Sequence, residues 1–187
     1  MISDKDECPE QALADLLEIA ADDEKGVAEA DRLLLEYPRD PRLHFLRGSI
    51  LAGMGRIEEA GRAMGEAVEI APGFAIARFQ LGFLLFTSGD PDSAAEVWAP
   101  LLEAPEGDSL ALFVRGLAHL ARDEFADAAA MLREGIAANR FNPALNADMN
   151  RLIAEIEAIP PDSSGEDEPM SLAQLALRQS AARSTRH

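Results

Sequence analysis

The stretch that decides the fold runs from residue 41 to residue 74 and reads PRLHFLRGSILAGMGRIEEAGRAMGEAVEIAPGF. Its pattern returns twice more along the chain, each time after 34 residues. The residues that keep this period are Gly48, Gly82 and Gly116, then Phe45, Phe79 and Phe113, then Ala60, Ala94 and Ala128, and finally Pro38 and Pro72. A period of this length is typical of a repeated helical hairpin.

The repeated glycines predict that helices approach each other closely. Each glycine falls in the first helix of its hairpin, where it costs about 1 kcal/mol of helix propensity relative to alanine. A helix tolerates this cost where a neighbouring helix needs the space of the missing side chain. Asp90 before Pro91 predicts an N-cap followed by a proline at the first helical position. Pro100 predicts that the second helix of its hairpin is cut short or kinked.

The repeated residues resemble the tetratricopeptide repeat. The resemblance implies an all-α fold, an α-solenoid of helical hairpins with a C-terminal capping helix. It also implies a non-catalytic module that binds other proteins. The residues that carry it are Gly48, Leu51, Ala60, Met64, Ala67 and Pro72 in residues 41–74, Leu81, Gly82, Leu85, Ala94 and Trp98 in residues 75–108, and Leu112, Gly116, Ala128 and Leu132 in residues 109–142.

The organisation predicted for the chain has four parts. Residues 1–39 form a degenerate first hairpin, and residues 40–142 form the three repeats. Residues 143–159 form a capping helix with one apolar stripe, which seals the last repeat. Residues 160–187 form a polar linker and a short basic amphipathic tail helix. The residues that keep the first hairpin in phase are Ala14, Leu17, Leu33 and Pro38.

Composition excludes several classes of function. The 187 residues carry a formal net charge of −17, which repels nucleic acid phosphates. No run of 18 apolar residues is present, so we expect no membrane insertion. The acidic N-terminus lacks the apolar core of a signal peptide, and the single Cys8 excludes an internal disulfide. We therefore expect a cytoplasmic acidic protein. The abundance of alanine, and of arginine relative to lysine, suggests a bacterial source.

The sequence offers no catalytic constellation. None of the three histidines stands at metal-ligand spacing, and no phosphate-binding glycine loop is present. We expect His44 and His119 to be core residues. Cys8 precedes an expected helix start, where its thiol would be somewhat reactive, but no base is placed beside it. We predict that the protein is not an enzyme, with no catalytic residue, no metal and no cofactor.

The resemblance implies that the first helices of the hairpins line a concave, strongly apolar groove. Such a groove would bind a helix or an extended peptide of a partner protein, and the acidic rim would favour a basic segment as well as an apolar one. The alternative is that some of these phenylalanines are core residues. The groove residues are Arg42, Phe45, Ser49, Ile76, Phe79, Phe83, Phe86, Phe113, Leu117 and Leu120.

Other uses of the same groove remain open. Small acidic chaperones of the type III secretion translocators look similar, and the chain could also be an accessory subunit of an enzyme complex. Alternatively, the basic tail could dock on the chain itself until a partner displaces it. Ser171 and Gln174 have the spacing of a capping box that would start the tail helix. The tail residues expected to dock are Leu172, Leu175 and Arg178.

Overall fold

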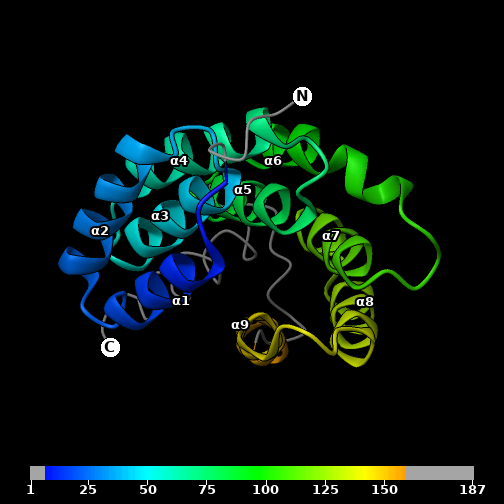
Figure 1. The fold of residues 1–187 in the computed structure, drawn as a ribbon. Helices are drawn as coiled ribbons and strands as arrows, with labels where there is room; N and C mark the ends of the chain where they lie inside the picture. Colours follow the sequence, from blue (N-terminus) through cyan, green and yellow to red (C-terminus); the bar gives the residue numbers. More distant parts are fainter. Residues whose placement is uncertain (1–6, 159–187) are drawn as a thin grey trace. The chain divides into compact units, whose positions relative to one another are not determined.

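The computed structural model describes residues 7–158, and within this range the chain is helical without any strand (Figure 1). The tail residues Leu172, Leu175 and Arg178 lie outside the described residues. The helices are α1 (Glu10–Ile19), α2 (Asp23–Glu36), α3 (Pro41–Gly53), α4 (Ile57–Ile70), α5 (Ala75–Thr87), α6 (Pro91–Trp98), the 3-10 helix η1 (Ala99–Glu103), α7 (Ser109–Leu120), α8 (Phe125–Ala138) and α9 (Pro143–Glu157).

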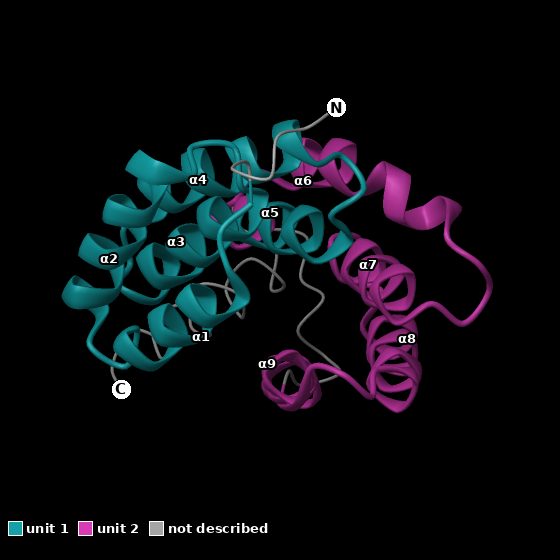
Figure 2. Cartoon of the chain, in the orientation of Figure 1, with its two compact units in different colours: residues 1–84 teal, residues 85–187 magenta. Residues whose placement is uncertain are grey.

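The helices fall into two compact units (Figure 2). Unit 1 comprises residues 1–84, with α1 to α4 and most of α5. Unit 2 comprises residues 85–187, with the end of α5 followed by α6, η1, α7, α8 and α9. Each unit is built from helical hairpins, with α3 packed along α4 in unit 1 and α7 packed along α8 in unit 2.

Short polar side chains start most of these helices. An N-cap oxygen satisfies one of the backbone N–H groups that the first helical turn leaves without a partner. Asp90 accepts from the backbone N–H of Ser93, and Pro91 follows it, as predicted from the sequence. The expected interruption is also confirmed, because α6 ends at Trp98 and continues as a 3-10 helix that contains Pro100. Equivalent caps are Asp22, Asp40, Asp108 and Asn142.

The close approach predicted from the glycines is present in both units. A Cβ atom added to Gly48 would lie 2.7 Å from Cγ of Met64 on the opposite helix. A Cβ atom on Gly116 would lie 2.9 Å from Cγ of Leu132. Such distances are too short for real Cβ atoms, so a larger residue would push the two helices of the hairpin apart. The glycines therefore set the spacing of α3 from α4 and of α7 from α8.

Helix α1 departs from the repeat, and the predicted phase of its residues is wrong. Ala14 is exposed and Leu17 is 59% exposed, whereas Leu13 and Leu16 are buried. Contact with α2 and α3 decides which side chains of α1 are buried, since Leu33 and Leu43 of these helices belong to the same core cluster. The helix instead turns Leu13 and Leu16 into a core that it shares with Leu43 of α3.

Helix α9 buries the apolar stripe expected of it. It packs on α8 in unit 2, and Asn142 caps its start by accepting from the backbone N–H of Leu145. Burying such a stripe is what holds a helix of this length in place, since isolated helices of this length are marginal in water. The stripe consists of Leu145, Met149, Leu152, Ile153 and Ile156.

Candidate functional site

In unit 1, four of the predicted groove residues keep partly exposed side chains on α3 and α5. They are Phe45, Ser49, Ile76 and Phe83, and we call them the α3–α5 face. Ser49 and Phe83 lie one 34-residue period apart, so they occupy equivalent positions on the two helices. Phe45 meets the ring of Phe74, just before α5, edge to face with the ring centroids 5.3 Å apart. Aromatic pairs in this geometry stabilise each other beyond the area they bury.

Phe79 lies beneath this face and is not part of the open surface that the sequence predicted. Its side chain is 0% exposed. Its ring stacks on Phe83 with the centroids 6.1 Å apart and the planes 10° from parallel. Phe83 is one helical turn further along α5, so the buried ring supports the half-exposed one. Phe79 is therefore a core residue that holds the α3–α5 face in shape.

In unit 2, the four predicted groove residues are buried, so placing them on an open groove is wrong for the described structure. A Cβ atom built on Gly135 of α8 would lie 2.5 Å from the ring of Phe113, so this ring fills the space between α7 and α8. Phe86 packs on Trp98 of α6 with the ring centroids 5.7 Å apart. The core alternative is the better description of Phe86 and Phe113, because both rings lie within their own hairpins. Leu117 and Leu120 are 0% exposed.

Arg42, the one charged residue of the predicted groove, ties the start of α1 to α3. Its Nη2 donates to the backbone carbonyl of Cys8 and to Oδ2 of Asp40, both at 2.7 Å, and its Nε donates to Oδ1 of Asp40 at 3.0 Å. Its Nη1 donates to the carboxylate of Glu10 on α1. Arg42 therefore serves the fold through these bonds, and the partner contact predicted for it is not supported.

The electrostatics of this cluster follow from its bonding. Burial raises the pKa of the Asp40 carboxyl, but donors from Arg42 and the backbone N–H of Cys8 outweigh burial and leave the pKa below its usual value. The Asp40 hydrogen bond holds the pKa of Arg42 above its usual range. Burial raises the pKa of the Cys8 thiol, and the Asp40 carboxylate raises it further. The thiol that the sequence marked as reactive is thus buried and protonated at neutral pH.

The two histidines differ in environment. His44 is buried, as predicted, and its Nε2 lies 2.9 Å from the backbone carbonyl of Pro38. His119 is not a core residue, because its side chain is 30% exposed at the end of α7. Its Nδ1 lies 2.6 Å from the Glu124 carboxylate. His119 does not lie in the core because α7 ends one residue later, and the following turn places the Glu124 carboxylate beside its ring.

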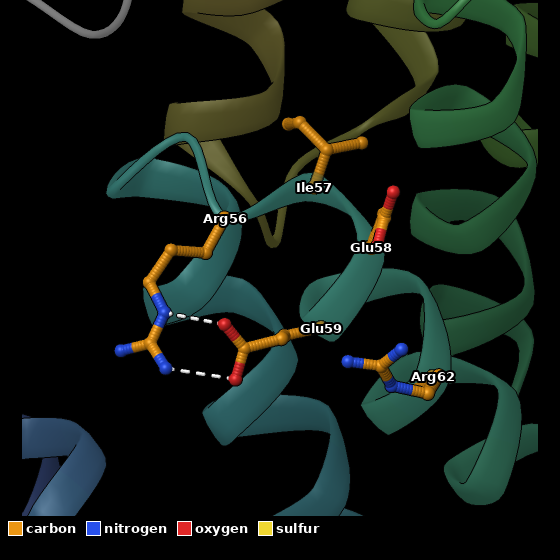
Figure 3. A pocket seen from close by; sticks show the side chains of 5 residues that line it. All are labelled: Arg56, Ile57, Glu58, Glu59 and Arg62. Atoms are coloured by element: carbon orange, nitrogen blue, oxygen red, sulfur yellow. Dashed lines mark hydrogen bonds and ion pairs between the residues drawn. The ribbon is translucent and has the colours of Figure 1, made fainter.

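A shallow depression of about 340 Å³ lies at the start of α4 (Figure 3). Arg56 closes one side by donating from Nε and Nη2 to both carboxylate oxygens of Glu59, each at 2.7 Å. Ile57, Glu58 and Arg62 complete the wall. Because the arginines and glutamates balance in charge and Arg56 is already bonded, the depression has no feature that would select a ligand.

Residues 7–158 contain no group of three or more histidine, cysteine or acidic side chains arranged to hold a metal ion. In the same residues, no helix combines the length and the apolar character needed to traverse a bilayer. Sequence reasoning missed one residue beside the α3–α5 face, Phe74. Phe74 falls outside the helix that the repeat pattern assigns to the groove, so only the packing of its ring on Phe45 reveals it.

The geometry defines an all-α protein of repeated hairpins with a partly exposed aromatic face. A family model described as tetratricopeptide repeat matches residues 9–74 and 79–158. The chain therefore belongs to the tetratricopeptide repeat family, as the sequence pattern indicated. Repeats of this family generally mediate protein–protein interactions, and typical members are non-catalytic interaction modules. No curated protein matches the chain.

Proposed function

We propose that this protein is a non-catalytic interaction module that holds an apolar helix or extended peptide of a partner on its α3–α5 face. The observation that carries the proposal is the half-buried state of Phe45 and Phe83 on two first helices of unit 1. Rings held in place from below offer apolar area without a large loss of side-chain freedom on binding. Phe74 supports Phe45, and Phe79 supports Phe83.

The size of the surface decides what kind of partner it suits. A phenylalanine buries about 150–250 Å² when it is fully covered, and these rings are already partly covered. The face alone is therefore smaller than a standard interface, which buries about 1,200–2,000 Å² in total. It suits a short segment anchored by one or two apolar side chains rather than a globular surface.

A secretion chaperone is a second use of the same face, and the sequence pI of about 4.4 fits the acidic chaperones that the sequence resembles. This use requires that the occupant be an exported, aggregation-prone protein. Co-expression with the product of a neighbouring gene tests it, because a chaperone keeps such a product soluble and a simple adaptor does not.

Selection of short peptides displayed on phage tests the α3–α5 face. The test variant carries Phe45→Ser and Phe83→Ser, and circular dichroism checks that it remains folded. Phe141→Ser is the matched control, because Phe141 is 96% exposed in unit 2 and its replacement removes the same chemistry elsewhere. The proposal expects enriched peptides with the wild type and with the control, and none with the double variant. Equal enrichment by a folded double variant contradicts it.

A further inference from the structure

The turn between α8 and α9 in unit 2 holds the most exposed large apolar side chain of the described residues. Phe141 lies in this turn and is 96% exposed. Burying a side chain of this size stabilises a protein by about 1.5–3 kcal/mol relative to leaving it in water. The fold does not gain this free energy from Phe141. Its exposed neighbours along the chain are also apolar and small: Ala137, Ala138, Pro143 and Ala144.

The hairpin repeat does not require an aromatic residue at this position. Arg39, Gly73 and Gly107 occupy the equivalent positions of the earlier turns, at intervals of 34 residues, and all three are exposed. An arginine or a glycine therefore serves the turn as well as a phenylalanine does. Exposure is a property of this position in the repeat, and only the α8–α9 turn places an aromatic ring there.

The side chain of Asn139 fixes the backbone that carries the ring. Asn139 is buried, and its Oδ1 accepts from the backbone N–H groups of Phe141 at 3.4 Å and Asn142 at 3.2 Å. Its Nδ2 donates to Oδ1 of Asn146 on α9 at 2.8 Å, and Nδ2 of Asn146 donates back to the carbonyl of Asn139 at 3.0 Å. A turn held in this way loses little backbone freedom when its exposed side chain is bound.

The residue before Phe141 adds a positive charge to the turn. Arg140 is exposed and is the only charged residue from position 135 to position 147. Within residues 7–158, its guanidinium group forms no ion pair. Such a group pairs with a carboxylate through two parallel hydrogen bonds. Arginine and phenylalanine are both enriched at the centres of protein interfaces.

Shape and charge decide which occupant fits this pair of residues. One ring that projects from a turn needs a concave apolar site, and a flat surface would cover only part of it. The depression at the start of α4 does not match, because charged side chains line most of it, so a second copy of the chain offers no suitable pocket there. An anionic membrane would repel a chain with a net charge of −17.

We propose that Arg140 and Phe141 form a docking tip for a different protein: Phe141 enters a concave apolar pocket of this partner, and Arg140 pairs with a carboxylate at the rim of the pocket. The ring supplies about 150–250 Å² of contact, far below the roughly 1,200 Å² of a stable interface. The tip alone therefore makes a weak, transient contact. It lies in unit 2 and does not involve the α3–α5 face, so it goes beyond the proposed function and is independent of it.

Cyclodextrins test the chemistry of the tip on the full chain. The apolar cavity of β-cyclodextrin accepts a phenyl ring, and its carboxymethyl and amino derivatives differ in the charge at the rim. NMR titration at physiological salt follows the ¹³C-labelled phenylalanine rings, and the Phe141 signals are those missing from Phe141→Ser. We expect these signals to shift with both derivatives. Unchanged Phe141 signals overturn the proposal.

The ratio of the two affinities tests the charge. Arg140→Gln should lower the affinity for the carboxymethyl form relative to the amino form several-fold. Arg39→Gln is the matched control, because it removes the same charge from the exposed turn before α3 and should leave the ratio unchanged. An equal ratio in the wild type and Arg140→Gln overturns the pairing with a carboxylate.

Photocrosslinking identifies the occupant. The full chain with p-benzoylphenylalanine in place of Phe141 is made in the cells that naturally contain the protein. The proposal expects a cross-link to a different protein that, once purified, binds the wild type at least about tenfold more tightly than folded Phe141→Ser. Absence of a cross-link, a cross-link to lipid, to residues 159–187 or to a second copy, or equal binding of Phe141→Ser overturns it. Selection of peptides on the α3–α5 face is a separate assay, so either proposal can fail without the other.

Discussion

Replacing Asp40 by alanine tests how the N-terminal helix is held. The side chain is 0% exposed and accepts four hydrogen bonds, from the backbone N–H of Cys8 at 2.7 Å, from that of Arg42 at 2.9 Å, and from Nε and Nη2 of Arg42 at 3.0 and 2.7 Å. Removing one partner of a buried ion pair costs about 3–5 kcal/mol. The Arg42 side chain is 31% exposed and keeps Glu10, so water and Glu10 recover part of the loss. We expect the free energy of unfolding to fall by about 3 kcal/mol.

Urea unfolding followed by circular dichroism measures this change. Asp31→Ala is the control, because Asp31 also pairs with an arginine of α3 but its side chain is 53% exposed. An exposed ion pair contributes about 0.2–1 kcal/mol, so the control should lose no more than that. A loss below about 1 kcal/mol for Asp40→Ala would refute the view that this buried carboxylate anchors α1.

The same cluster predicts a dependence on pH. The folded-state pKa of Asp40 lies below its usual value of about 4. A depressed pKa stabilises the folded state above the unfolded-state pKa, and this stabilisation is lost as the pH falls through the folded-state pKa. The difference in unfolding free energy between the wild type and Asp40→Asn should therefore be constant from pH 7 to about pH 5 and shrink below about pH 4. A difference that grows on acidification contradicts the direction of the shift.

Three more variants or reagents test the packing of unit 2, the burial of Cys8 and the role of the tail. Gly135→Ala should destabilise unit 2 by about 1–3 kcal/mol, because its Cβ atom would lie 2.5 Å from the Phe113 ring. Gly65→Ala, whose Cβ atom would have nothing within 4 Å, should instead stabilise the chain by about 0.5–1 kcal/mol. Urea unfolding measures both changes. Cys8 should react with a thiol reagent such as DTNB only as fast as the chain opens, and a rate equal to that of a free thiol would show that it is not buried. If the tail covers the α3–α5 face, deleting residues 160–187 should tighten binding of a peptide selected on that face, and an unchanged affinity would exclude that role.

Part of the candidate site could be predicted from the periodic pattern. The period placed Phe45 and Phe83 on first helices, and both retain exposed surface on the α3–α5 face. The same reasoning placed Phe113 beside them, yet its ring fills the space that Gly135 leaves within its own hairpin. One position of the repeat thus has a different environment in successive hairpins, because the residues opposite it differ.

The sequence by itself determined the helices, their starts and the close contact inside each hairpin. These features depend on neighbours along the chain, such as Asp90 before Pro91, or on a residue repeated at a constant spacing, such as Gly48. Only the tertiary structure decided which side chains remain available and which charges are neutralised. Leu17 is exposed because α1 turns Leu13 and Leu16 toward the core that it shares with Leu43, and Arg42 is occupied because Asp40 and Glu10 reach it. Burial and ion pairing depend on atoms that the fold brings together from distant positions, and helical periodicity carries no information about them.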